Sequence, residues 1–126
     1  NPLAMAGVRA IDRICSDEAL ATAEEFNLQA LTRIGDIIDE YQLPAHTVGF
    51  GVKGCVTWST APVRNYRDYK ATDFGVAEAH WLFALNRGII TPPGLDEQWL
   101  ISLAHTQTEI DILVEDFAEF AKAIRA

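Results

Sequence analysis

The chain has 126 residues, of which 49% are hydrophobic and 22% charged, and its net charge is −8 at pH 7. This length and composition predict a single globular domain over residues 1–126, because the chain is too apolar to be disordered. The acidic balance argues against nucleic acids and anionic membrane surfaces as partners, since both need clusters of Lys and Arg, and no apolar run reaches the roughly 18 residues of a membrane span.

The first third of the chain has the three-to-four-residue apolar spacing of helices. We expect one helix over residues 2–14, with Asn1 as its N-cap and Pro2 in its first turn, and a longer helix over residues 18–41 that Pro44 ends. The buried stripe of the longer helix is expected to be Leu28, Leu31, Ile34, Ile38 and Tyr41. Because a helix begins at the first residue, we expect the chain to be a fragment of a longer protein.

The period then changes to alternation over residues 47–58, which predicts a β-hairpin with its turn at Lys53-Gly54. The glycines at 49, 51 and 54 indicate a bulge, a bend or a close approach by other backbone. Their spacing also matches a dinucleotide-binding pattern. No helix follows them directly, so we interpret them as part of the hairpin.

A polar, aromatic loop is expected over residues 61–73, followed by a helix over about 73–87. Thr72 or Asp73 caps this helix, and Gly88 ends it. Its buried stripe is expected to be Phe74, Ala77, Trp81 and Leu85.

Two further strands are expected, over residues 89–91 and 98–104, and the second should be central because it is apolar on both sides. Thr106 and Glu109 form a capping box for a last helix, which is expected to direct inward Ile110, Leu113, Val114, Phe117, Ala121 and Ile124. The element order predicts an α/β (α+β) fold, a small and mostly antiparallel sheet of three to four strands with helices packed on one face. The other face can be buried against a part absent from the chain.

The residues that could bind a metal have no suitable spacing. His46, His80 and His105 do not form a metal-binding motif, and Cys15 and Cys55 are not part of a C-x-x-C pair. We therefore predict no metal site, and we expect two buried, reduced thiols in a cytoplasmic protein. His105 is expected to hydrogen-bond the backbone at the start of the last helix.

Two polar stretches each allow two interpretations. In VRNYRDYK, residues 63–70, Arg64 with Tyr66 can clamp a carboxylate or phosphate, or the stretch is an ordered surface loop. Glu97, beside Asp96 and Gln98, either belongs to a solvated turn or faces a site.

Four stretches, in order along the chain, resemble the C-terminal domain of class III, fold-type I aminotransferases that use pyridoxal phosphate, and most closely the glutamate-1-semialdehyde aminomutase group. They are NPLAMA at 1–6, VRNY at 63–66, RGIITPP at 87–93 and EQWLISLAHTQTEID at 97–111. The combination spans nearly the whole chain and is specific, although each motif alone is not. It implies the small domain of such an enzyme, packed on a large pyridoxal-phosphate-binding domain of the same chain, in a homodimer.

The resemblance also implies where the chemistry lies. The Lys that holds the cofactor belongs to the large domain, so this chain alone is expected to be inactive and to bind no pyridoxal phosphate. Asn1 is implied to follow the loop that holds the cofactor phosphate. Glu97 aligns with an acidic residue at the edge of the active site, and with Arg64 and Tyr66 it is our candidate for the substrate entrance.

The substrate is expected to be a small amino acid or semialdehyde, with both reaction types open. Gly94 and Asp96 stand where the aminomutase pattern has a serine and an aromatic residue, so a transaminase fits equally well. Residues 99–104 lack the Arg of the ornithine and GABA types. The alternative is a non-catalytic binding or structural module with the same fold.

Overall fold

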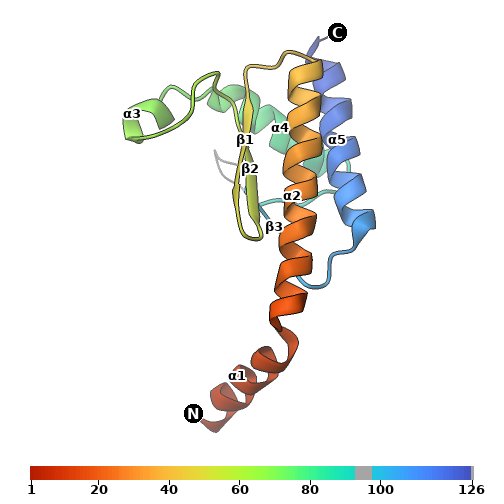
Figure 1. Ribbon diagram of the computed structural model, residues 1–126. Coiled ribbons are helices and arrows are strands. Elements are labelled where there is room, and N and C mark those ends of the chain that lie inside the picture. The colour runs from red at the N-terminus through yellow and green to blue at the C-terminus, as the bar shows by residue number, and fades with distance from the viewer. Residues whose placement is uncertain (93–97, 126) are drawn as a thin grey trace.

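The computed structural model describes residues 1–92 and 98–125. Within these residues the elements are α1 Pro2–Ile14, α2 Asp17–Glu40, β1 His46–Phe50, β2 Lys53–Thr57, α3 Tyr66–Tyr69, α4 Phe74–Asn86, β3 Trp99–Leu100 and α5 Gln107–Arg125. The strands form one antiparallel sheet. α2 packs along both the hairpin and α5, and α4 packs against α5 (Figure 1). The predicted α/β class with a small antiparallel sheet is confirmed.

Both N-terminal helices begin at capping residues, and Asn1 is the cap expected for the first of them. Asn1 Oδ1 accepts a hydrogen bond from the Leu3 N–H at 3.0 Å, and Ser16 Oγ accepts one from the Ala19 N–H at 3.2 Å. No residue of α1 is buried, and the helix projects from the rest of the molecule (Figure 1). Its large apolar side chains are all exposed: Leu3, Met5, Val8, Ile11 and Ile14. Such a patch is available to another surface.

α2 buries a stripe of mainly small residues: Ala23, Asn27, Ala30, Ile34 and Ile38. Ile34 and Ile38 confirm part of the predicted stripe, and Leu31 and Tyr41 are half-buried. The prediction was wrong for Leu28, which is 64% exposed. The hairpin meets α2 at Leu31 and Asn27, and a pattern based on large apolar residues does not detect buried Ala and Asn side chains.

The turn of the hairpin lies two residues earlier than predicted. β1 and β2 pair along their whole length, and the turn is at Gly51 and Val52, whereas Lys53 and Gly54 already belong to β2. Gly51 has a φ of 56°. Glycine adopts this left-handed conformation without strain, so it is the residue that the turn requires.

The sheet face toward α2 has no room for side chains at two of its glycines. Gly49 and Gly54 lie opposite each other in the ladder. A Cβ at Gly49 would lie 2.4 Å from the Leu31 side chain, and one at Gly54 would lie 2.4 Å from the ring of Trp99. The predicted approach by other backbone is found at Gly49, where a Cβ would lie 2.8 Å from the Lys53 carbonyl, but at Gly54 the approaching atoms belong to the Trp99 side chain.

Among the described residues, no helix packs on the opposite face of the sheet. Alternation places Val48 and Phe50 of β1 on this face, together with Leu100 of β3. Val48 and Leu100 are about half exposed, and Phe50 is 90% exposed. This is the face that the sequence analysis left open to burial against another part.

β3 is shorter than predicted and lies at an edge. Of residues 98–104, only Trp99–Leu100 pairs with β2. The Ile101 N–H adds one bond to the Val52 carbonyl at 2.9 Å, and the chain then turns toward α5. The strand order β1-β2-β3 makes β2 the central strand. The predicted central position was wrong. The run is apolar because Trp99 and Ile101 enter the core, and not because strands flank it on both sides.

Residues 89–91 do not form the predicted strand. The Ile89 N–H donates to the Ala84 carbonyl at 3.0 Å, and Gly88 has a φ of 87°, so this stretch completes the C-terminal end of α4. The Thr91 carbonyl accepts a bond from Trp81 Nε1 at 3.3 Å. These bonds tie the stretch to α4 and keep it out of the sheet.

α4 buries a different face from the one predicted. Asp73 caps it as expected, through bonds from the Gly75 and Val76 N–H groups to its Oδ1. The buried residues are Ala77, His80 and Ala84, so of the predicted stripe only Ala77 is among them. The helix is apolar on nearly all sides, so residue spacing alone could not indicate which face meets α5.

α5 completes the core along the predicted stripe, with two differences. Ile110, Val114, Phe117 and Ala121 are buried, and Leu113 is half-buried. Ile124 was predicted to be inward but is 42% exposed. It lies in the last turn of α5. There Arg125 donates to the Tyr41 and Gln42 carbonyls, just past the end of α2, so α2 no longer covers this part of α5.

Two residues of α5 that the pattern did not select are also buried. Phe120 packs edge-on against Trp58, with ring centroids 5.8 Å apart. Asp116 is buried, and its Oδ1 lies 2.6 Å from Nε of Arg87. The guanidinium of Arg87 in turn lies over the Phe83 ring. A buried carboxylate needs such a partner, and the partner comes from the end of α4.

Candidate functional site

The chain on both sides of the predicted site residue Glu97 lines a hollow. Glu97 itself lies outside the described residues, so its role remains a prediction. The segment 88–92 and β3 enclose the hollow together with the first turns of α5, and its volume is about 440 Å³. Its walls are mainly apolar and include Ile89, Ile90, Leu100, Ile101, Ile112 and Leu113. This hollow is the candidate functional site.

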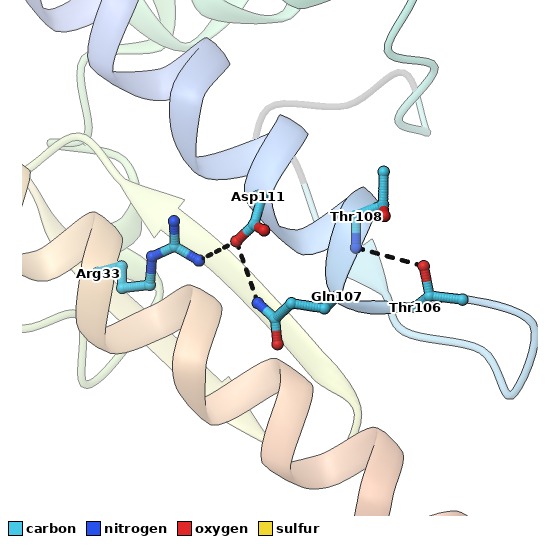
Figure 2. Close-up of polar contacts among 5 residues, drawn as sticks. All are labelled: Arg33, Thr106, Gln107, Thr108 and Asp111. Carbon is cyan, nitrogen blue, oxygen red and sulfur yellow. Dashed lines mark hydrogen bonds and ion pairs between the residues drawn. The ribbon is translucent and has the colours of Figure 1, made fainter.

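The start of α5 lies at this hollow and is held by the predicted capping box. Thr106 Oγ1 accepts a bond from the Thr108 N–H at 3.3 Å (Figure 2). Glu109 Oε2 accepts bonds from both the N–H and the hydroxyl of Thr106 at 2.7 Å. The hydroxyl bond, and then the backbone bond, lower the pKa of Glu109 from its ordinary value of 4.5. The capping box is confirmed, and Glu109 is an anion at neutral pH.

His105, also at the hollow, bonds backbone in the turn before α5 rather than at the start of the helix, where the bond was predicted. Its Nδ1 accepts a bond from the Ser102 N–H at 2.8 Å, in the turn just before α5. Because Nδ1 is an acceptor, the proton of the neutral ring is assigned to Nε2. His105 and Glu109 are thus both engaged at the helix start. The described part of the hollow offers an apolar surface with an acidic group at its edge.

An ion pair joins the first turn of α5 to α2. Arg33 Nη1 donates to Asp111 Oδ1 at 2.5 Å, and Gln107 Nε2 donates to the same oxygen at 3.1 Å (Figure 2). The bond from Arg33, and then that from Gln107, lower the pKa of Asp111. Exposed pairs of this kind add little stability. This pair links the start of α5 to α2.

Asn27 anchors the other wall of the hollow, and sequence reasoning missed it. Its Nδ2 donates to the carbonyls of Gly51 and Lys53, both at 2.8 Å, and its Oδ1 accepts from Trp99 Nε1 at 2.8 Å. One buried side chain therefore joins α2, the hairpin turn and β3. The sequence did contain a signal for Asn27. It follows Ala23 at helical spacing, at a position on the inward face of α2 where an apolar residue is expected.

The other predicted site residues lie apart from this hollow. Arg64 and Tyr66 are exposed, at the start of α3, which stands away from the sheet and helices (Figure 1). Asn1 caps the far end of α1. The structure thus does not bring Arg64 or Tyr66 together with Asn1. The roles of Arg64 and Tyr66 at a substrate entrance remain predictions.

Reactive side chains are dispersed over the surface. Lys53, Lys70 and Lys122 are all exposed, on three different parts of the chain. Cys15 is exposed between α1 and α2 and Cys55 is half-buried, so the expectation that both thiols are buried was wrong: neither position lies in the core between α2 and α5.

Over residues 1–92 and 98–125, no group of His, Cys, Asp and Glu side chains is arranged to hold a metal ion. The helices in the same ranges are too short or too polar to cross a membrane.

Comparison with known sequences finds relatives for most of the chain. No family model matches it. The chain is 29% identical, over 91% of its length, to a glutamate-1-semialdehyde 2,1-aminomutase 2 of Brevibacillus brevis, and 26% identical over 91% to a glutamate-1-semialdehyde 2,1-aminomutase of Syntrophobacter fumaroxidans. It spans only 27% of each of these relatives.

Solved structures show the same fold. A glutamate-1-semialdehyde aminomutase from Pseudomonas aeruginosa superimposes with a TM-score of 0.79 at 18% identity, over 85% of this chain and 24% of that one. A β-phenylalanine aminotransferase from Variovorax paradoxus gives 0.73 at 19% identity, over 81% and 23%. These findings confirm the resemblance to glutamate-1-semialdehyde aminomutases and aminotransferases.

Proposed function

We propose that this chain is the C-terminal small domain of a larger pyridoxal-phosphate-dependent aminotransferase or 2,1-aminomutase. The observation that carries the proposal is that nearly the whole chain matches about a quarter of each of several aminomutases. The parent would be a cytoplasmic homodimer that acts on a small amino acid or semialdehyde. The large domain of the same chain would hold the cofactor.

We expect the described residues of this chain not to form a site for pyridoxal phosphate by themselves. A cofactor aldehyde is held by a lysine amine that burial or a neighbouring cation keeps partly deprotonated. Each of the three lysines here is exposed. The cofactor would therefore be bound outside these 126 residues, and this chain would contribute walls rather than reacting groups.

Two uncovered apolar surfaces support a large domain packed against this one. The first is the exposed patch on α1, and the second is the open face of the sheet, where Phe50 is 90% exposed. A soluble domain rarely exposes several such side chains unless another surface covers them. The hollow beside segment 88–92 would then form part of the substrate entrance.

The location of the cofactor provides a test. We expect that borohydride reduction of the complete protein with pyridoxal phosphate modifies one lysine upstream of Asn1. The 126-residue chain alone should leave the absorbance of the free aldehyde unchanged. Peptide mass spectrometry identifies the modified residue. A saturable adduct at Lys53, Lys70 or Lys122, or no adduct anywhere in the complete protein, would contradict the proposal and favour a binding or structural module.

A second expectation concerns Glu97 in the complete protein. Glu97→Gln should retain the fold and the cofactor but slow turnover about ten- to a hundredfold, which corresponds to roughly 1.5–3 kcal/mol for a charged hydrogen bond. The amide preserves the size of the side chain and removes its charge. Steady-state kinetics measure the effect, and Glu78→Gln on the exposed side of α4 is the matched control. An unchanged kcat/KM would assign Glu97 to a solvated turn.

A further inference from the structure

Two walls of the candidate site are each attached to the protein through the indole N–H of a tryptophan. Trp81 Nε1 donates to the Thr91 carbonyl at 3.3 Å, and Trp99 Nε1 donates to Asn27 Oδ1 at 2.8 Å. The first bond reaches segment 88–92 and the second holds β3, and both of these stretches line the hollow. One kind of hydrogen bond is therefore found at two walls of the same hollow.

The strand pairing that holds the β3 wall is short. Of the described residues that follow α4, only Trp99–Leu100 pairs with β2, and the Ile101 N–H adds one bond to the Val52 carbonyl at 2.9 Å. So short a ladder is at best marginally stable by itself. The position of this wall therefore depends strongly on what the side chain of Trp99 contacts.

The Trp99 ring is held by a close contact and by its bond to Asn27. Trp99 is 7% exposed, and a Cβ at Gly54 would lie 2.4 Å from its ring. Asn27 is itself fixed, because its Nδ2 donates to the Gly51 and Lys53 carbonyls, both at 2.8 Å. These two bonds leave the amide oxygen for Trp99, and an amide oxygen needs a donor such as an indole N–H. Asn27 and Trp99 therefore fit each other in one orientation.

The wall formed by segment 88–92 is attached to α4. At the end of that helix the Ile89 N–H donates to the Ala84 carbonyl at 3.0 Å. Two residues further on, Trp81 reaches from the middle of α4 to the Thr91 carbonyl. Within the described part of the chain this segment belongs to no strand. Its far end therefore depends on the bond from Trp81.

We infer that the Trp99–Asn27 and Trp81–Thr91 bonds keep the two walls at the spacing that a substrate needs. The inference rests on the proposed function, in which the hollow is part of the substrate entrance. Trp81, Trp99 and Asn27 are then positioning residues that act through the walls. When one bond is lost, fewer molecules have the walls at this spacing, and the apparent affinity for substrate falls by the same fraction. Bound substrate restores the spacing, so the turnover of the filled site changes little.

Replacing a tryptophan by phenylalanine removes the indole N–H and keeps an aromatic ring. In the complete protein with pyridoxal phosphate, Trp99→Phe and Trp81→Phe should each raise KM for the amino donor about three- to tenfold, the range expected for one hydrogen bond between uncharged groups. Under the same conditions kcat should change by less than about twofold. The donor is the one that the wild type uses best among the common amino acids, with pyruvate or 2-oxoglutarate as acceptor, and glutamate-1-semialdehyde.

The third tryptophan of the chain provides a matched control. Trp58 is 2% exposed, packs against Phe117 and Phe120, and does not line the hollow. Within the described residues its Nε1 has no hydrogen-bond partner. Trp58→Phe therefore makes the same change of ring size in the core without removing a bond, and it should leave KM unchanged. Circular dichroism and the cofactor content of each variant check that it is folded.

Hydrogen exchange in the 126-residue chain gives a readout that does not depend on turnover. Trp99→Phe should speed the exchange of the Ile101 N–H about three- to tenfold relative to that of the Ile34 N–H, because the bond to Val52 opens when the β3 wall moves. Ile34 lies in the buried stripe of α2 and reports the stability of the whole domain. Trp58→Phe should leave the ratio of the two exchange rates unchanged.

The outcomes separate this inference from the proposed function. A complete protein that turns over none of these donors would contradict the proposed function and, with it, the inference. If the wild type is active but Trp99→Phe and Trp81→Phe raise KM no more than Trp58→Phe does, the inference is overturned and the proposed function stands. A fall in kcat at unchanged KM, or an unchanged exchange ratio in Trp99→Phe, would also overturn it. The variants alter different walls, so either one decides if the other fails to fold.

Discussion

Replacing Asn27 by alanine is expected to reduce the free energy of unfolding by about 3–5 kcal/mol. The side chain is 1% exposed and makes three hydrogen bonds at 2.8 Å. Its loss leaves the Gly51 and Lys53 carbonyls and Trp99 Nε1 without this partner, and each buried polar group left unsatisfied costs about 1–3 kcal/mol. Urea unfolding followed by circular dichroism measures the change.

Two further variants separate hydrogen bonding from packing at this position. Asn27→Leu fills a similar volume without hydrogen bonds and should be about as destabilising as Asn27→Ala. Asn86→Ala, at the exposed end of α4, makes the same chemical change outside the core and should have little effect. If Asn27→Leu were as stable as the wild type, packing rather than hydrogen bonding would be the contribution of Asn27.

Gly54→Ala is expected to cost about 2–4 kcal/mol. The new Cβ would lie 2.4 Å from carbons of the Trp99 ring, and overfilling a packed core usually costs about 1–3 kcal/mol. Trp99 can move away only by loosening its bond to Asn27, which adds to the cost. Gly7→Ala is the matched control. Gly7 has no atom within 4 Å of its Cβ position and lies inside α1, so this change should stabilise by about 0.5–1 kcal/mol.

The effects of Asn27 and Gly54 should not be additive, because both act through Trp99. A double variant, Asn27→Ala with Gly54→Ala, should lose less stability than the two single losses together, by at least about 0.5 kcal/mol. Without Asn27, Trp99 has already lost its bond and can make room for the new methyl group. Strict additivity in urea unfolding would mean that the clash at Gly54 is relieved by some other movement.

Helix ends were the most predictable feature of the fold. Asn1, Asp73 and the pair Thr106 and Glu109 all cap helices as expected, because a cap is decided by residues within one turn of each other. Alternation likewise predicted the hairpin. The four sequence stretches that resemble aminomutases also indicated the correct relatives, since several motifs in order carry more information than single residues.

The errors arose where a contact that residue spacing does not reveal decided the outcome. Residues 89–91 have the composition of a strand, but their backbone groups bond α4. Leu28 has the spacing of a core residue, but the hairpin meets α2 at Asn27 and Leu31, and Leu28 is 64% exposed. Residues 61–73 were correctly expected to form mainly a loop, but the short helix α3 and its projection from the body were not expected.

The sequence by itself therefore determined the helices, the hairpin, the class of fold and the family that the chain resembles, because these depend on caps, period and motif order. Tertiary structure alone decided that Asn27 joins three elements, that Gly54 must lack a side chain, and that β3 lies at the sheet edge. Asn27 and Trp99 are 72 positions apart in the chain. Only folding places an amide and an indole N–H within 2.8 Å of each other in a buried space, where a polar group without a partner is costly.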